Sequence, residues 1–182
     1  SCGGGYGGRG ARGSYGDSGG LTYGTATGRL FAGSGSSCTN YGAVDGGRGG
    51  GLVQVEASGD IVLDGGAISA NGAYGGGSGG GIWLECRTIK GSGSVRADGG
   101  NADGYSGAGG GGRIAVRYDS VAQALVDPKP NIVFAVSNQC PAYSGIPSQM
   151  GTIYFADHHI LKSELSPIYG YVYFSTNEIF FT

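Results

Sequence analysis

The sequence predicts an all-β protein, a parallel β-solenoid or β-helix with glycine-rich turns. Three observations lead to this class: short runs in which apolar and polar residues alternate, a unit of about thirty residues that recurs, and glycine runs on both sides of the alternating segments. The chain has 182 residues, of which 43 are glycine. Collagen is excluded because the glycines keep no every-third spacing and the chain has only 5 prolines.

The repeat is clearest in two successive segments. Residues 46–76, GGRGGGLVQVEASGDIVLDGGAISANGAYGG, and residues 76–107, GGSGGGIWLECRTIKGSGSVRADGGNADGYSG, share one order: a glycine run, an alternating strand, a turn, a short second strand and another glycine loop. A third copy begins at GGGGRIAVRYDS and then becomes less regular. Val53, Ile82 and Ile114 hold equivalent positions, so we expect them to stack in neighbouring coils.

The alternating strands predict which side chains face inward. Ile82, Leu84 and Cys86 alternate with polar or bulky residues, and one unit is too small to bury this apolar stripe alone. Stacked units would bury it, and glycine at the corners would accept a positive φ and place no Cβ against the next coil. An alternative uses glycine for the same close approach: packed polyglycine-II-type helices with short strands.

Composition changes along the chain predict three parts. Residues 1–45 read as a glycine-rich cap or irregular first coil, and residues 46–166 as the solenoid repeats. Residues 167–182 are aromatic and strand-like, and are expected to start a following β domain or a linker strand. The chain opens at Ser1 without Met or a signal peptide, so we expect a segment of a longer protein.

Charge and hydropathy argue against two classes of partner. The net charge is −2, only 13% of residues are charged, and no basic face is evident, so no nucleic-acid partner is expected. No apolar run approaches the ~18 residues of a membrane span, so no membrane insertion is expected in this segment.

The four cysteines favour an extracellular or cell-surface location. Cys2, Cys38, Cys86 and Cys140 are even in number, widely spaced and without a CxxC pair, so three full pairings stay open and at least one disulfide is predicted. The alternative for Cys86, on an apolar strand face, is a buried free thiol.

Motifs for catalysis, cofactors or metals are weak. Residues 107–112 fit GxGxxG, but they precede a strand where a dinucleotide site needs a helix. His158 and His159 are adjacent, and on an extended segment they would point to opposite faces. Asp98 and Asp103 flank a glycine loop, but the calcium-binding nonapeptide does not recur. We therefore predict no catalytic residue, no cofactor and no metal site.

Several sequence blocks occur in a familiar order. CGGGYGGRGA and GGGLVQVEASGDIVLDGGAISANG come first, then GGGSGGGIWLECRTIKGSGSVRADGGN with GGGGRIAVRYDS, and finally QCPAYSGIPSQMGTIYF. This order, over most of residues 2–155, resembles the glycine-rich ectodomain repeat of large surface proteins of plants, algae and other protists. The resemblance implies a secreted or cell-surface β-solenoid-like segment, and it carries no catalytic residues to transfer. Cys2 and Cys140 lie in family-like blocks, whereas Cys38 and Cys86 do not.

The expected function is a non-enzymatic structural module that contributes to a filament, flagellar hair or matrix assembly. Its expected partners are neighbouring domains of the same chain, further copies or other extracellular structural proteins. Two alternatives stay open: a ligand-binding receptor or adhesin ectodomain, and a polysaccharide-active β-helix enzyme using Trp83, Glu85 and Arg87 on one outward face. The predicted interaction surface consists of aromatic residues: Trp83, Tyr169, Tyr171, Tyr173, Phe180 and Phe181.

Overall fold

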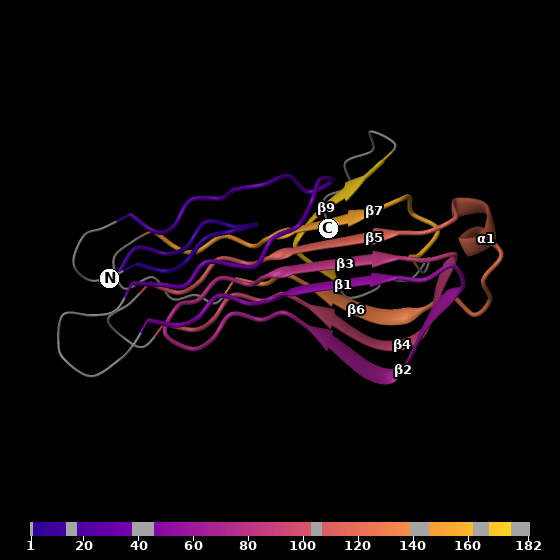
Figure 1. Ribbon diagram of the computed structural model, residues 1–182, viewed down its shortest axis with the longest axis horizontal. Coiled ribbons are helices and arrows are strands. Elements are labelled where there is room, and N and C mark those ends of the chain that lie inside the picture. Colours follow the sequence, from indigo (N-terminus) through magenta and orange to yellow (C-terminus); the bar gives the residue numbers. More distant parts are fainter. Residues whose placement is uncertain are drawn as a thin grey trace.

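The chain forms two parallel sheets in an elongated, layered arrangement (Figure 1). This computed structural model describes residues 2–13, 18–37, 46–102, 107–138, 146–161 and 168–175. The five-stranded sheet has the order β1 (Leu52–Glu56), β3 (Gly81–Glu85), β5 (Arg113–Arg117), β7 (Thr152–Phe155) and β9 (Tyr171–Phe174). The four-stranded sheet has the order β2 (Asp60–Ser69), β4 (Thr88–Arg96), β6 (Asn131–Ala135) and β8 (Ile168–Tyr169). The chain thus alternates between the two sheets.

The predicted β-solenoid is wrong: the described residues form two separate sheets, and no closed coil joins them. The alternative of packed polyglycine-II-type helices with short strands is wrong as well. The described residues form two parallel sheets of five and four strands, and β2 and β4 are 10 and 9 residues long. The prediction failed on the glycines, which were expected to form corners. Instead they extend the chain beyond the sheet ends, and only six described glycines have a positive φ.

Strand register follows the sequence repeat. The predicted alignment of Val53, Ile82 and Ile114 is confirmed, since Val53 pairs with Ile82 and Ile82 with Ile114. Ile153 and Val172 continue the same column through β7 and β9. One equivalent apolar position per strand therefore sets the register of the whole five-stranded sheet.

The core lies between the two sheets. Ile82 and Leu84 on β3 face Ile89 and Val95 on β4, and all four side chains are fully buried in one cluster. Farther along, the aromatic rings of Phe134 and Phe155 meet edge to face at 5.0 Å. At ~25 cal/mol per Å² of apolar area, side chains of this size each contribute about 1.5–3 kcal/mol on burial.

A short helix, α1 (Ser120–Ala124), covers one end of the molecule (Figure 1). Asp119 caps it by accepting hydrogen bonds from the backbone N–H groups of Val121 and Ala122. Gln123, fully buried, accepts from Ile89 N at 2.8 Å and donates to Ile89 O at 3.1 Å. Because the amide satisfies both backbone groups of Ile89, the helix is fixed against β4. No helix in the described ranges is long and apolar enough to cross a membrane.

Glycine segments pack side by side at the other end of the molecule. Gly109 N donates to Gly100 O at 2.9 Å, and Gly8 N donates to Gly111 O at 2.8 Å. A Cβ on Gly109 would lie 2.0 Å from the backbone oxygen of Gly77, so a side chain has no room there. The glycine runs thus let segments far apart in sequence bond backbone to backbone.

The terminal segments pack against the same two sheets. Residues 18–37 run along the outer face of the five-stranded sheet, where Leu30 clusters with Ala115 and Tyr154. At the other end of the chain, β8 pairs with β6 and β9 pairs with β7 in parallel. Residues 168–175 therefore extend the two sheets. They are the described part of residues 167–182, which we expected to start a following β domain or a linker strand, and that division of the chain stays a prediction.

Candidate functional site

A groove of about 390 Å³ lies on the outer face of the five-stranded sheet. It runs between residues 29–30 of the outer segment and the neighbouring strands β1 and β3. Its lining is mixed apolar and polar: Arg29, Leu30, Leu52, Gln54, Glu56 and Trp83. Gln54 and Trp83 are paired across β1 and β3, and both project outward because their neighbours fill the core.

Arginine holds the indole of Trp83 in place. The guanidinium of Arg117 lies 4.7 Å from the Trp83 ring centroid and 5.8 Å from that of Tyr154. Its Nη2 also donates to the carbonyl oxygen of Thr27 at 3.1 Å. The cation–π contact and the tether to the outer segment restrict the rotamer of Trp83, so the groove has a pre-formed aromatic wall.

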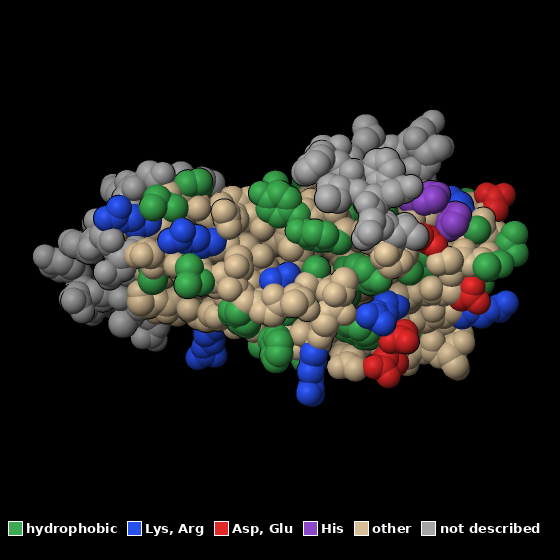
Figure 2. Space-filling view, turned by 90° about the horizontal axis from the view of Figure 1, so that it is seen from above, with side chains coloured by type: hydrophobic (Ala, Val, Ile, Leu, Met, Phe, Trp, Pro, Cys, Tyr) green, Lys and Arg blue, Asp and Glu red, His purple; other side chains and the backbone are tan. Residues whose placement is uncertain are grey.

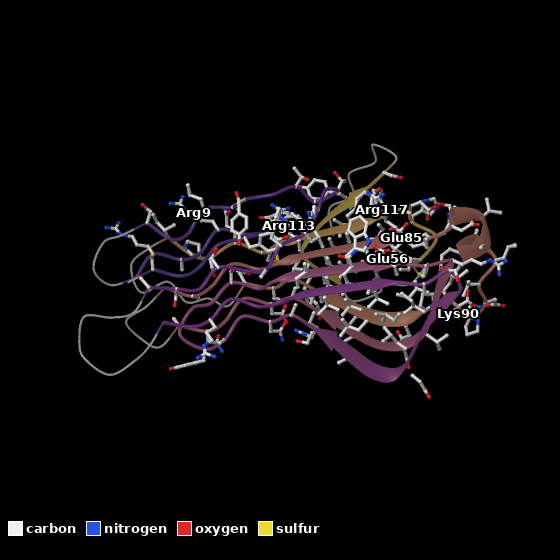
Figure 3. The ribbon with its side chains drawn as sticks, viewed as in Figure 1. Arg9, Glu56, Glu85, Lys90, Arg113 and Arg117 are labelled. Carbon is white, nitrogen blue, oxygen red and sulfur yellow. The ribbon has the colours of Figure 1, made fainter. Side chains whose placement is uncertain are left out.

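A row of charged residues crosses the same end of the sheet. Glu56 pairs with Glu85, and Glu85 with Arg117, so the three lie at neighbouring positions across β1, β3 and β5 (Figure 3). Gln54 Nε2 donates to Glu56 Oε1 at 2.6 Å. The groove therefore combines an indole, an amide, a carboxylate and an arginine, which suits a ligand rich in hydroxyl groups.

The predicted outward set of Trp83, Glu85 and Arg87 is only partly brought together. Trp83 and Glu85 lie on β3, but the strand ends at Glu85 and Arg87 lines a different groove. Instead, Arg117 on the neighbouring strand β5 lies over the ring of Trp83. The alternation rule failed for Arg87 because it holds only within the strand.

The second groove, of about 530 Å³, lies beside α1 and is lined by Asp60, Arg87, Lys90 and Leu125 among others. Its charges are partly paired. Asp60 accepts hydrogen bonds from Lys90 Nζ at 2.6 Å and Thr88 Oγ1 at 2.7 Å, and these bonds lower the pKa of its carboxyl group.

Titratable side chains meet where β7 ends. Tyr118 donates to the backbone oxygen of Asp157 at 2.5 Å, and His159 Nδ1 lies 3.1 Å from Asp157 Oδ2. Burial acts to raise the pKa of Asp157, but hydrogen bonds from Ser120, His159 and Tyr118 outweigh it and lower the pKa to about 2. Burial, reinforced by the charge of Asp157, raises the pKa of Tyr118.

The two histidines do not point to opposite faces as the sequence suggested. The rings of His158 and His159 lie 4.5 Å apart, because they sit on a turn rather than on an extended strand. Within the described ranges, no three His, Cys, Asp or Glu side chains gather closely enough to hold a metal ion.

Of the cysteines, Cys86 is buried and Cys2 half-buried, and both are free thiols. Cys86 Sγ lies 3.9 Å from Arg117 O, and burial raises the pKa of its thiol. Cys2 lies against Ser37, with 3.8 Å between Sγ and Oγ. Cys38 and Cys140 lie outside the described residues, and the disulfide stays a prediction.

Among the predicted interaction residues, Tyr169, Tyr171 and Tyr173 expose 51%, 49% and 43% of their surface, respectively. They project from β8 and β9, whereas Trp83 is half-buried. Phe180 and Phe181 lie outside the described residues. Figure 2 shows Lys and Arg side chains spread along the molecule and acidic side chains gathered toward the α1 end.

Sequence reasoning missed Arg113, which is 6% exposed. It lies over the Tyr6 ring at 5.4 Å and donates to Thr152 Oγ1 at 2.7 Å. Its Nη2 also donates to the carbonyl oxygens of Tyr23 and Gly24 at 3.0 and 3.1 Å. Burial lowers its pKa, and these bonds attach the outer segment to β5. Nothing in the local pattern marks partners some ninety positions away.

The chain matches no family model, no curated protein and no solved structure.

Proposed function

We propose that the chain is a non-enzymatic structural module of a large extracellular or cell-surface protein, contributing to a filament, flagellar hair or matrix assembly. The observation that carries this proposal is the array of backbone hydrogen bonds that continues from the two sheets into the glycine segments. Gly99 N donates to Ser137 O at 2.9 Å, and Gly110 N donates to Gly4 O at 3.0 Å, so distant segments are tied directly together.

Such an array suits a load-bearing element. Backbone groups of many segments are bonded laterally, so no single segment can be drawn out without breaking bonds to its neighbours. Glycine permits this density because a Cβ would meet a neighbouring carbonyl, as at Gly109. The molecule is also elongated (Figure 1), as a spacer or filament unit requires.

The extracellular location is supported by the sequence. The even number of cysteines and the order of the glycine-rich blocks both favour it. Surface biotinylation of intact cells that produce the full-length protein is the direct test. Labelling equal to that of a cytosolic control protein would contradict the location.

Electron microscopy of the purified full-length protein tests the structural role. We expect fibres, or regular decoration of a larger fibre. The proposal would be contradicted if the protein stayed monomeric at every concentration and also failed to bind fibres isolated from the surface of the cells that produce it.

A second candidate, a ligand-binding ectodomain, is favoured by the Trp83 groove. Its indole, amide and carboxylate match the aromatic stacking and hydrogen bonding that sugars use. Binding to a panel of neutral and acidic glycans tests this candidate. Trp83→Ala should abolish saturable binding, while Tyr74→Ala, at an exposed position outside the groove lining, should leave it unchanged. Equal binding by both variants would remove this candidate.

A further inference from the structure

The first strand of the five-stranded sheet, β1 (Leu52–Glu56), has an open side, which we call the β1 edge. One side of β1 pairs with β3, and no strand in the described part of the chain pairs with the other side. Val53 and Val55 on this strand pack against the core but are only half-buried. Their partners on β3, Ile82 and Leu84, are fully buried. One more strand in register would complete the burial of the two valines.

Every second residue of β1 directs its backbone groups to this edge. In a parallel sheet, alternate residues turn both their N–H and their C=O to the same side. Gly51 O and Ala57 N bond to β3, at 3.1 and 2.8 Å respectively, so the odd-numbered residues face that strand. Leu52, Gln54 and Glu56 therefore present their N–H and C=O groups to the β1 edge. An added strand can bond these groups without disturbing any bond within the sheet.

The neighbouring edge strand, β2 (Asp60–Ser69), is less suited to receive a strand. Its register against β4 shifts between Asp64 and Gly66, and Gly65 at this bulge has a φ of 69°. A bulge of this kind interrupts the row of backbone groups along an edge. In contrast, all residues of β1 pair with successive residues of β3. An added strand is therefore expected on β1.

Charge indicates which kind of strand fits the β1 edge. Glu56 lies directly opposite Glu85 in register, and like charges at such positions repel (Figure 3). Glu85 has Arg117 as its other neighbour, whereas Glu56 has no described strand on its open side. Residues 52–69 contain no Lys or Arg. A lysine or arginine in an added strand would hold beside Glu56 the position that Arg117 holds beside Glu85.

The glycine that precedes β1 leaves room for such a strand. Gly51, Gly80 and Gly112 precede β1, β3 and β5, three successive strands of the sheet. A Cβ on Gly80 would lie 2.0 Å from Gly51 O, and a Cβ on Gly112 would lie 2.1 Å from Gly80 O. Each of these two glycines thus admits a carbonyl group of the preceding strand. A Cβ on Gly51 would meet nothing within 4 Å, so the equivalent space beside β1 is open.

We propose that the β1 edge receives an extended segment of a partner protein, which adds in parallel as a further strand of the five-stranded sheet. Its inward residues are valine or isoleucine and continue the core past Val53 and Val55. Its outward residues are lysine or arginine and face the side of β1 that carries Glu56. Its inward residues also exchange backbone hydrogen bonds with Leu52, Gln54 and Glu56. This inference deepens the proposed structural function, on which it rests, by naming the partner as a basic β-strand of another chain.

The test measures binding of a synthetic peptide to the full 182-residue chain by fluorescence anisotropy. The probe, GGKVKVKAS with a fluorophore at its C-terminus, copies residues 50–58, GGLVQVEAS, and replaces the three outward residues by lysine. It should bind saturably. The acidic peptide GGEVEVEAS should bind at least about tenfold more weakly, because its carboxylates meet the acidic edge. Equal binding of the two peptides, or no saturable binding of the probe, overturns the inference.

Methylation of backbone nitrogens in the probe tests the parallel orientation. In a parallel strand the two valines direct their N–H groups to β1 and the lysines direct theirs away, whereas in an antiparallel strand the lysines face β1. Methylating both valine nitrogens should therefore abolish binding. Methylating the backbone nitrogens of the first two lysines is the matched control and should leave binding unchanged. The reverse result would show an antiparallel strand and overturn the inference.

Two glycine substitutions locate the added strand. Gly51→Ala should abolish binding of the probe, because the new Cβ would occupy the position of the added strand's carbonyl oxygen. Gly59→Ala is the matched control and should bind the probe as the wild type does. A Cβ there also meets nothing within 4 Å, but the equivalent residue one strand farther in is Arg87, so a side chain fits at this position when a strand lies beside it.

Neither alanine variant should lower the Tm, so a loss of binding in Gly51→Ala alone reports the loss of the site. Binding that survives in Gly51→Ala, or that is lost equally in both variants, overturns the inference. Such a result leaves the structural function standing, because electron microscopy of the full-length protein tests that function separately.

Discussion

Replacing Gly109 by alanine should destabilise the fold more than its single methyl group suggests. The added Cβ would lie 2.0 Å from Gly77 O and 2.6 Å from Gly77 C, far inside contact distance. Neither atom can rotate away, because both belong to the backbone. Overpacking of this kind costs about 1–3 kcal/mol. Displacing the segment also weakens the Gly109 N to Gly100 O bond, worth about 0.5–1.5 kcal/mol. Together the two effects should destabilise the fold by about 1.5–4.5 kcal/mol.

Gly51→Ala is the matched control, since a Cβ at Gly51 meets no atom within 4 Å. Alanine there reduces the freedom of the unfolded chain and should be neutral or stabilising by up to about 1 kcal/mol. For a domain of this size, Gly109→Ala should lower the Tm in a calorimetric scan by about 3–18 °C. Equal Tm values for the two variants would refute the claim that glycine is required there by close backbone approach.

Three further changes test other contacts. Arg113→Met removes the hydrogen bonds to Tyr23 O and Gly24 O, so it should lower the stability of the fold by about 1–3 kcal/mol and speed proteolysis within residues 18–37. The control Arg48→Met, at an exposed position, should not speed proteolysis, and equal cleavage of the two variants would contradict the tether. The lowered pKa of Asp157 contributes stability that is fully present above pH 3.8 and is lost as the pH falls through about 2. The stability of Asp157→Asn should therefore depend less steeply on pH in this range than that of the wild type, and superimposable acid-unfolding curves of the two proteins would contradict this role. The thiol of Cys86 is buried and its pKa is raised, so it should resist alkylation in the native protein and react after unfolding. Mass spectrometry measures the alkylation, and rapid alkylation of Cys86 in the native protein would contradict its burial.

The sequence predicted the strands and their register but not the way they join. Alternation around Ile82 and Leu84 identifies a strand with one buried face, and the recurring unit aligns that strand with its neighbours. Glycine runs carry no such information, because glycine accepts extended and positive-φ backbone about equally. The same letters therefore fit a corner, a helix or an extended segment, and the structure uses mainly the extended form.

The candidate groove was only half predictable for a related reason. Trp83 projects outward as its strand position predicts, but Arg117 is supplied by the next strand of the sheet and Leu30 by the outer segment. Residues 18–37 show only a weak strand pattern, so nothing local indicates that they cross the sheet. Contacts between neighbouring strands follow from the repeat, whereas contacts with this segment depend on tertiary packing.

The glycine segments also explain why stability here must be collective. Each ordered glycine costs about 0.5–1 kcal/mol relative to alanine, so the segments need compensation from their neighbours. A Cβ on Gly109 would strike Gly77 O, and a Cβ on Gly77 would strike Arg48 O, so three successive segments are in mutual backbone contact. A change in one segment must therefore be felt by segments about thirty residues away in either direction, the spacing of one repeat. This coupling predicts that destabilising substitutions in different glycine runs will be non-additive when the runs touch and additive when they do not.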